Sequence, residues 1–423
     1  MHAGLLSGGD ELGLCDDTPP QPSGNQVNSY NRMEVVAIIP ARGGSQRLSR
    51  KNLRMVAGFP LIVHTIQHAR RSRLVTRTVV STEDPEIAAI SQNSGVEVIE
   101  RPAELASETA DSESALLHVL DYLNRAEGYS PDLVLFLQCT SPVRRPDDID
   151  KAIQSLLDSG ADSLFSATAS KWLFWRSSGL WAESFNYDYR QRQREQDMTN
   201  EWRENGSIYV CKPWMLQKHR NRLGGKVAVY EMGYWSSFQV DSLEDLELCD
   251  WILRRQQREQ QLTALPARIA AIVFDFDGVF TDNRVLVSED GTEAVFCNRA
   301  DGLGLDRLSV TGLPLLVLST EKNPVVAARC RKIGIEYRQG LADKARALTQ
   351  FASERGIPLS EVIYVGNDLN DQECLAAAGC GIVVADAHPA VQSLARVVLQ
   401  SGGGQGAVRE VCDLVLEKLG KMG

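Results

Sequence analysis

The clearest chemical signal in the sequence is a basic, glycine-containing segment, IIPARGGSQRLSRKN, at residues 38–52. An apolar run ends at Pro40, and small residues follow it, among them Ser45. Backbone N–H groups in such loops bind anions, and arginine and lysine side chains supply the countercharge. We therefore expect Arg42 and Lys51 to hold a nucleoside triphosphate, because such ligands bind after the strands of a parallel sheet. The alternative is an arginine-rich surface loop.

A second segment, FDFDGVFTD at 274–282, places Asp275 and Asp277 two residues apart after an apolar run. One carboxylate of such a pair can act as a nucleophile while the other acts as a general acid and base, both beside Mg²⁺. A lone pair of this kind is a weak signal. Three later features strengthen it, namely Ser319 after LLVL, Lys344 in LADKA, and GNDLND at 366–371.

The elements that must position these residues alternate between strands and helices. Short, β-branched runs predict strands at 34–40, 77–82, 96–100, 133–138, 163–168, 206–211 and 226–232, with helices at 60–72, 112–126 and 244–261. A second series predicts strands at 269–278, 314–320, 362–368 and 379–386, with a helix at 344–356. This alternation predicts an α/β fold with two doubly wound, mostly parallel sheets.

The domain boundaries follow from composition. Residues 1–32 are rich in Gly, Pro, Ser, Asn and Asp, which predicts a disordered tail. We expect a first domain at 33–262, a linker at 263–267 around Pro266, and a second domain at 268–423. A chain of 423 residues is long enough for two domains of this kind.

Charge and cysteine content limit the partners and the compartment. With 45 Lys and Arg against 55 Asp and Glu, the net charge of −10 argues against binding to nucleic acid or anionic membranes. The sequence has no apolar stretch long enough to span a membrane and no signal-peptide pattern at its start. The nine cysteines are scattered and form no CxxC pair, which favours a reducing compartment. We expect a cytoplasmic protein.

Five motifs in order carry a family resemblance. The 38–52 segment, VSTED (80–84), RPAELASETADS (101–112), LQCTSPVR (137–144) and RENGSIYV (203–210) resemble the acylneuraminate cytidylyltransferases, which are the CMP-sialic acid synthetases. The resemblance covers nearly all of 34–255. It implies a nucleotidyltransferase-like fold of Rossmann type. It also implies a reaction that joins CTP to a nine-carbon 2-keto sugar acid and releases pyrophosphate.

The resemblance also implies roles for individual residues. Arg42 and Lys51 match the triphosphate cations, which stabilise charge on the phosphates and the leaving pyrophosphate. The implied substrate-binding residues are Ser45 and Asn52 in the loop, Arg101 and Ser112 at cytidine and ribose, Gln138 near the sugar, and Arg194, Asn205 and Tyr209. Arg194 stands in for the family's carboxylate-binding arginine, whose aligned position is Glu195. For Tyr209, packing in the core is the alternative.

A hard metal ion, Mg²⁺, is implied at the phosphates. The family pattern has two aspartates one residue apart, but FQVDSLEDLEL (238–248) has Gln239 at the first position and Asp241 at the second. Asp241 is therefore the one carboxylate ligand that this sequence offers. The alternative is that Asp241 caps the following helix.

The second set of motifs resembles the haloacid dehalogenase-like phosphatases over about 269–412. It is closest to the small capless group that acts on phosphorylated keto-sugar acids. The resemblance implies that Asp275 attacks phosphorus, that Asp277 transfers protons, and that Ser319 and Lys344 hold the phosphoryl oxygens. Its implied metal residues are Asp275, Asp277, Asn367, Asp368 and Asp371. Asn367 departs from the family's usual aspartate, which lowers the expected Mg²⁺ affinity.

Three hypotheses follow from the two resemblances. The first is a bifunctional enzyme that makes a CMP-sugar and removes the 9-phosphate of the sugar. The second is a synthetase with an inactive assembly domain, and the third is a nucleotidyltransferase for another sugar. The second domain's relatives form tetramers whose C-terminal tail reaches a neighbour's site. Because SGGGQGAVREV at 401–411 resembles that tail, we expect a homotetramer.

Overall fold

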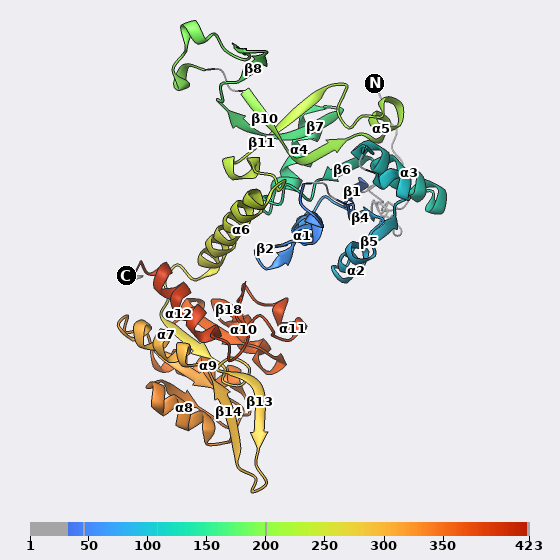
Figure 1. The fold of residues 1–423 in the computed structure, drawn as a ribbon. Helices are drawn as coiled ribbons and strands as arrows, with labels where there is room; N and C mark the ends of the chain where they lie inside the picture. The colour runs from blue at the N-terminus through green and yellow to red at the C-terminus, as the bar shows by residue number, and fades with distance from the viewer. Residues whose placement is uncertain (1–32, 45–46, 108, 199–200, 421–423) are drawn as a thin grey trace, which may run out of the picture.

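The computed structural model describes residues 33–44, 47–107, 109–198 and 201–420. The predicted disordered tail at 1–32 and the candidate residue Ser45 lie outside the described residues. Figure 1 shows two α/β bodies that follow each other along the chain. Each body is built around its own sheet, so the predicted fold class is confirmed.

The first body contains a seven-stranded sheet in the order β11-β7-β10-β6-β1-β4-β5. Neighbouring strands are parallel except β10, which runs antiparallel to both β6 and β7. The strands are β1 (Val35–Pro40), β4 (Arg77–Thr82), β5 (Glu97–Glu100), β6 (Leu133–Leu137), β7 (Ser163–Ser170), β10 (Glu201–Cys211) and β11 (Val227–Met232). All seven were predicted. The largest difference is that β10 begins five residues before the predicted 206–211.

Helices cover both faces of this sheet because successive strand residues point to opposite faces. In β1, Val35, Ala37 and Ile39 pack into one buried cluster with α1 (Leu61–Arg71) and α4 (Asp148–Ser159). Val36 and Ile38 pack into another with α3 (Ser112–Glu127) and α5 (Pro213–His219). The remaining elements are α2 (Pro85–Asn93) and the short strands β2 (Met55–Val56) and β3 (Phe59–Pro60).

The second body contains a six-stranded, fully parallel sheet in the order β16-β15-β12-β17-β18-β19. Its strands are β12 (Ala271–Phe274), β15 (Leu315–Leu318), β16 (Glu336–Arg338), β17 (Val362–Gly366), β18 (Cys380–Val383) and β19 (Val397–Val398). Its helices are α7 (Arg299–Ser309), α8 (Val325–Ile333), α9 (Lys344–Glu354), α10 (Gln372–Ala377), α11 (Pro389–Gln392) and α12 (Ala407–Lys418). One continuous cluster of buried side chains forms its core.

Two antiparallel hairpins extend from the two bodies (Figure 1). The first, β8 (Trp175–Ser178) with β9 (Trp181–Ser184), follows β7, and the second, β13 (Thr281–Val287) with β14 (Glu293–Cys297), follows β12. The sequence analysis predicted neither hairpin. Their apolar side chains are largely exposed, for example Trp181 at 80% and Phe296 at 71%.

Helix α6 (Leu243–Ala264) joins the two bodies, and it continues two residues into the segment predicted as a linker. Near its end, Arg258 Nε lies 2.7 Å from Glu417 Oε2 on α12. Lys418 Nζ on α12 donates to the Leu262 carbonyl at 2.9 Å. Across the described ranges, no helix is both long and apolar enough to cross a membrane.

Candidate functional sites

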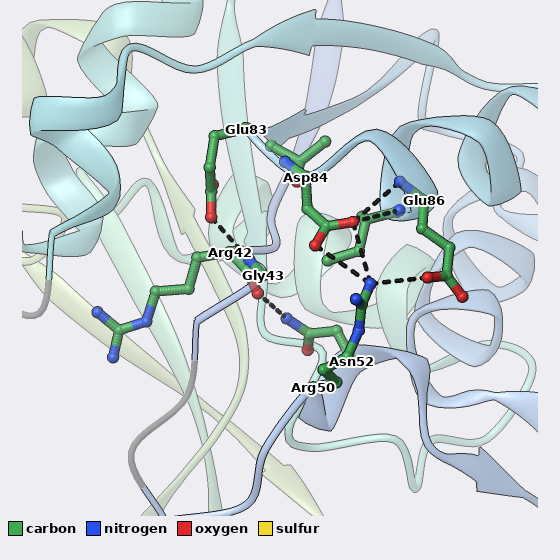
Figure 2. A network of polar contacts seen from close by, with 9 residues as sticks. Arg42, Gly43, Arg50, Asn52, Glu83, Asp84 and Glu86 are labelled. Atoms are coloured by element: carbon green, nitrogen blue, oxygen red, sulfur yellow. Dashed lines mark hydrogen bonds and ion pairs between the residues drawn. The ribbon is translucent and has the colours of Figure 1, made fainter.

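The predicted triphosphate loop leaves the sheet at the end of β1 and is held by polar contacts (Figure 2). The Gly43 backbone N–H donates to Glu83 Oε1 at 2.7 Å, and Asn52 Nδ2 donates to the Arg42 carbonyl at 3.0 Å. A side chain at position 43 would bring its Cβ within 2.9 Å of the Asp84 Cβ, so this position requires glycine. The loop therefore lies directly against the end of β4.

Arg50 and Lys51 in this loop are paired with carboxylates. Arg50 contacts Asp84 at 3.3 Å and Glu86 at 2.8 Å, as Figure 2 shows. Lys51 Nζ lies 2.9 Å from Asp241 Oδ1, a contact between residues 190 positions apart. A triphosphate could take over these contacts, because its oxygens are the same kind of anionic acceptor.

Asp241 does not cap a helix. Ser242 is the N-cap of α6, and it forms a capping box with Asp245. The Asp241 carboxylate instead faces Lys51, with 44% of its side chain exposed. The structure therefore replaces the helix-cap alternative with a contact to the triphosphate loop.

Of the predicted cytidine residues, Arg101 lies beside the same loop, because it contacts Ser81 at the end of β4. Arg42 Nη1 donates to the Ser107 carbonyl at 3.0 Å. Arg101 is buried, donates from Nε to Ser81 Oγ at 3.1 Å and also hydrogen-bonds to the Ser81 carbonyl. Burial lowers the pKa of the Arg101 guanidinium. Ser112 is the first residue of α3, whose N-cap is Asp111.

A bulge in β10 brings the predicted residue Gln138 close to Gln239. The register of β10 shifts between Glu204 and Tyr209. At Gly206, with φ of 64°, an added Cβ would lie 2.5 Å from Gln138 Oε1 and 2.7 Å from Gln239 Nε2. Gln138 and Gln239 therefore meet over a backbone that has no side chain.

Asn205 lies beneath this bulge and is fully buried. Its side chain accepts from Ser166 Oγ at 2.6 Å and donates to Ser236 Oγ at 3.1 Å. Its backbone carbonyl accepts from Gln239 Nε2 at 3.0 Å. The Asn205 side chain thus holds the bulge, and its carbonyl holds Gln239.

Tyr209 and Arg194 lie in contrasting surroundings. Tyr209 is buried, donates to Glu204, and stacks on Phe136 with ring centroids 5.4 Å apart. Burial raises the pKa of its phenol. Arg194 lies between β9 and β10 with its side chain 78% exposed, and its Nε contacts Asp197 at 3.1 Å. The described contacts of Arg194 do not bring it to the triphosphate loop.

In the second body, β12 ends at Phe274, so Asp275 and Asp277 lie in the loop that follows it. Lys344 Nζ lies 2.7 Å from Asp275 Oδ1 and 2.9 Å from Asp371 Oδ1. The Phe276 backbone N–H also donates to Asp275, at 2.7 Å. Burial raises the pKa of Asp275, and the charge of Lys344 opposes that shift.

Asp371 lies behind Lys344 and is fully buried. Tyr364 Oη donates to its Oδ1 at 2.6 Å, and the Asn367 backbone N–H donates to its Oδ2 at 2.9 Å. Asp371 was predicted among the metal residues, but these contacts direct its carboxylate toward Lys344 and the backbone. It therefore orients Lys344 in this structure.

A cavity of about 480 Å³ opens above these residues, and its lining includes Asp275, Asp277, Asn367 and Asp368. Burial and the nearby Glu321 carboxylate raise the pKa of Asp277. A carboxyl group that keeps its proton more readily than usual suits proton transfer to a leaving oxygen. Ser319 lies below the cavity, and its Oγ accepts from the Glu321 N–H at 2.9 Å.

Asn367 decides how Mg²⁺ fits this cavity. One terminal atom of its amide lies 2.9 Å from the Asp277 carbonyl oxygen and 3.1 Å from Asp275 Oδ2. Oriented with nitrogen at that position, the amide donates to both acceptors. Oriented with oxygen there, it adds a third oxygen beside the Asp277 carbonyl and Asp275 Oδ2, and oxygen atoms are the ligands that Mg²⁺ prefers.

The residues therefore fit Mg²⁺ once the Asn367 amide turns. Asp275 Oδ2, the Asp277 carbonyl and Asn367 Oδ1 would hold the ion. Among the residues that the structure describes, no group of three or more His, Cys, Asp or Glu side chains could hold a metal ion. Binding here relies on one carboxylate together with a carbonyl and an amide oxygen.

The glycine-rich segment at 401–411 packs on its own domain in this single chain. The Gly404 N–H donates to the Val279 carbonyl at 3.0 Å. A Cβ on Gly403 would lie 2.1 Å from the Gly278 carbonyl oxygen. The tail was expected to reach a neighbouring subunit; here it covers the turn after Asp277.

Sequence reasoning missed four residues that support the two sites, namely Thr65, Glu83, Arg144 and Tyr364. Arg144 stood in the LQCTSPVR motif without a role, and Glu83 stood in VSTED. The motif does not indicate that the Arg144 side chain is buried without an ionic partner, because burial and pairing are visible only in the three-dimensional structure. For Tyr364, the one indication in the sequence was a single hydroxyl-bearing side chain within the apolar run VIYVG.

Comparisons with known proteins find matches for both parts of the chain. Residues 36–200 match the family described as cytidylyltransferase, and residues 331–410 match that described as haloacid dehalogenase-like hydrolase. N-acylneuraminate cytidylyltransferase of Oncorhynchus mykiss is 28% identical over 403 residues, covering 92% of this chain and 90% of that protein. N-acylneuraminate cytidylyltransferase A of Danio rerio is 29% identical, covering 93% and 91%.

The second body has its own relatives. The 3-deoxy-D-manno-octulosonate 8-phosphate phosphatase of Escherichia coli K12 is 34% identical over 155 residues, which are 36% of this chain and 82% of that enzyme. A solved putative haloacid dehalogenase family hydrolase from Streptomyces avermitilis is 48% identical, with a TM-score of 0.35, and covers 36% of this chain and 87% of that one.

The chain thus joins a segment that matches the cytidylyltransferase family to a segment that matches the haloacid dehalogenase-like hydrolase family. Through the second domain, the chain belongs to the haloacid dehalogenase-like family that includes the 3-deoxy-D-manno-octulosonate 8-phosphate phosphatase. Over nearly its whole length, it is a homologue of proteins named N-acylneuraminate cytidylyltransferase.

Proposed function

We propose that this protein transfers CMP from CTP to the anomeric hydroxyl of a nine-carbon 2-keto sugar acid of the sialic acid type. The hydroxyl oxygen bonds to the α-phosphorus, its proton passes to water, and the bond to the bridging oxygen breaks as pyrophosphate leaves. No nucleophile from the enzyme is needed, so the protein contributes positioning and charge. The homologues that cover more than nine-tenths of the chain support this reaction.

One observation carries the proposal: the loop after β1 brings Lys51 to Asp241 at 2.9 Å. In the reaction, Arg42 and Lys51 stabilise the negative charge that grows on the leaving pyrophosphate. Ser45 and Asn52 complete the loop, while Arg101 and Ser112 bind cytidine and ribose. Mg²⁺, when bound beside Asp241, neutralises phosphate oxygens.

The sugar site is formed at the bulge of β10. Gln138 contacts the sugar over Gly206, where an added Cβ would meet its Oε1. Asn205 and Tyr209 shape the backbone beneath the sugar, since both side chains are already engaged within the protein. Arg194 binds the sugar carboxylate, and its exposed position requires the segment between β9 and β10 to approach the substrate.

The second domain removes the 9-phosphate of the sugar. The Asp275 carboxylate attacks phosphorus while Asp277 protonates the leaving ester oxygen, and water activated by Asp277 then hydrolyses the aspartyl-phosphate. Lys344 and Ser319 hold the phosphoryl group. Asp371 orients Lys344, and Asp368 borders the cavity. Mg²⁺, when held by Asp275, Asp277 and Asn367, adds countercharge. Asn367 brings no charge, so we expect a slow phosphatase.

We also propose a cytoplasmic homotetramer. The eight cysteines among the described residues are free thiols, which suits a reducing compartment. Exposed apolar side chains on β13 and β14, such as Leu286 at 59%, offer surface for assembly through the second domain.

The test is incubation of the full chain with CTP, Mg²⁺ and a panel of nine-carbon sugar acids, with products read by mass. We expect a CMP-sugar and an equal amount of pyrophosphate. ATP, GTP and UTP should give little product. Equal turnover with another triphosphate, or product only from a sugar 1-phosphate, would contradict the proposal and favour a different nucleotidyltransferase.

A further inference from the structure

A buried arginine that no motif role explains lies under the proposed sugar site. Arg144 is 2% exposed, and it is among the largest fully buried side chains in the described chain. Its Nη1 donates to Thr65 Oγ1 on α1 at 3.1 Å. Its Nη2 donates to the Gln138 and Ser207 carbonyls, each at 2.9 Å. One guanidinium therefore joins α1, the end of β6 and the bulge of β10.

The charge of Arg144 has no close partner. None of the ion pairs between described residues includes it, and its Nε makes no hydrogen bond. Asp148 is a carboxylate that acts on this charge, but it already accepts from the Arg145 N–H at 2.6 Å and from Tyr230 Oη at 2.9 Å. Burial and the charge of Arg144 lower the pKa of His68, so that neighbour stays neutral.

A buried charge without a partner is costly to the folded protein. Neutral carbonyl and hydroxyl acceptors offset only part of that cost. At this place in the fold, the guanidinium also holds the backbone of the proposed sugar site. Arg144 donates to the backbone carbonyls of Gln138 and Ser207. Gln138 is one of the two glutamines that meet over Gly206, and Ser207 follows Gly206 in the chain.

We propose that Arg144 is a positioning residue for cytidylyl transfer. Its guanidinium holds the backbone that carries Gln138 and Gly206, and its unpaired charge favours the two anionic substrates. This inference rests on the proposed function, since both CTP and the sugar acid are anions. It goes beyond that function because Arg144 acts through the backbone and through its charge.

Two substitutions separate the two effects. Arg144→Lys keeps the charge, but one ammonium cannot span three acceptors arranged for a planar fork. We expect kcat for the CMP-sugar to fall about tenfold, while the Kd for CTP changes by less than about threefold. Arg144→Gln removes the charge, and we expect its Kd for CTP, measured by calorimetry, to rise at least about fivefold.

The matched control is Leu123→Ala. Leu123 is fully buried on α3, in the cluster on the opposite face of the sheet from α1. Its truncation lowers stability without touching Arg144, and urea midpoints report that loss for all three variants. At equal loss of stability, Leu123→Ala should keep the wild-type kcat and CTP affinity. If an Arg144 variant does not fold, Thr65→Val removes one of the three contacts and should lower kcat about threefold.

The outcomes are decisive. Losses in both Arg144 variants, with none in Leu123→Ala, support the proposal. The proposal is overturned if the kcat of Arg144→Lys, or the Kd of Arg144→Gln for CTP, stays within about twofold of the wild-type value. It is also overturned if Leu123→Ala shows the same losses. Failure of the wild-type chain to make any CMP-sugar would overturn the proposed function instead. The calorimetric comparison of Arg144→Gln with wild type would still decide the part played by the charge.

Discussion

At the scale of single residues, Lys51 offers the most direct test of the transfer site. Its ammonium lies 2.9 Å from Asp241, and in the proposed reaction it neutralises the leaving pyrophosphate. Lys51→Ala should lower turnover at least tenfold, or about 1.4 kcal/mol of barrier. Steady-state pyrophosphate release measures this effect. The matched control is Arg47→Ala, because Arg47 is 77% exposed and lies 3.7 Å from the same carboxylate. Near-normal synthesis by Lys51→Ala would count against the site.

A substitution at Asp241 can test Mg²⁺ binding without disturbing the fold. Ser242 and Asp245 cap α6, so Asp241→Asn leaves the helix start intact. The substitution removes a charge that would attract Mg²⁺. We expect synthesis to need several times more Mg²⁺, on the order of five-fold, with unchanged phosphate release by the second domain. An unchanged Mg²⁺ titration of the synthetase would show that Asp241 is not a ligand.

In the second domain, a substitution at Asn367 can add a carboxylate to the proposed metal site instead of removing one. Its amide satisfies Asp275 Oδ2 and the Asp277 carbonyl without a metal. Asn367→Asp would place a second carboxylate there, which repels Asp275 in the free protein and attracts Mg²⁺. We expect a lower melting temperature than wild type in EDTA and a larger increase on adding Mg²⁺. Equal Mg²⁺ shifts in the two proteins would show that Asn367 does not limit the site.

At the scale of elements, the bulge of β10 is the feature on which the proposed sugar site depends. Gly206→Ala would place a Cβ 2.5 Å from Gln138 Oε1, at a φ of 64°. We expect the KM for the sugar acid to rise about tenfold and stability to fall by about 1–2 kcal/mol. Gly128→Ala is the matched control, since Gly128 has a φ of 67° and open space at its Cβ.

The control separates the backbone cost from the contact cost. Gly128→Ala should lose similar stability and keep the wild-type KM, because it lies at the end of α3. Steady-state kinetics and urea unfolding of both variants supply the comparison. If Gly206→Ala also kept the wild-type KM, Gln138 would not contact the sugar.

The same elements show why part of the fold could be predicted from the sequence. Strand β4 was predicted with its observed bounds, 77–82, because its β-branched residues Thr78, Val79 and Val80 are typical of a buried parallel strand. The hairpins β8–β9 and β13–β14 were missed because β8, β9 and most of β13 are exposed and leave no alternation between core and solvent. Surface strands of this kind depend on contacts that a single sequence does not show.

The site residues also divide into those that the sequence predicted and those that it did not. Asp275, Asp277 and Lys344 were found because each lies in a short motif. The contact of Lys51 with Asp241, and the place of Asp371 behind Lys344, join residues that are far apart in the chain. Arg144 carried no signal of its role, since its three acceptors come from three separate elements. Tertiary packing alone creates such groups.

At the scale of the whole molecule, the two domains have separate hydrophobic cores. The cluster that contains β12 and β17 shares no residue with the clusters around β1. Helix α6 connects them, and its Arg258 pairs with Glu417 on α12. Because the cores are independent, a change at one catalytic site should leave the other site folded.

This independence gives the last prediction, a pair of reciprocal losses in the full chain. Asp275→Asn keeps the size of the side chain and leaves Lys344 paired with Asp371, but it removes the nucleophile. It should abolish phosphate release from a sugar 9-phosphate in excess Mg²⁺ and leave CMP transfer unchanged. Lys51→Ala should do the reverse. A wild-type chain that releases no phosphate from any keto-sugar phosphate would contradict the bifunctional proposal, because Asp275 would then have no phosphoryl group to attack.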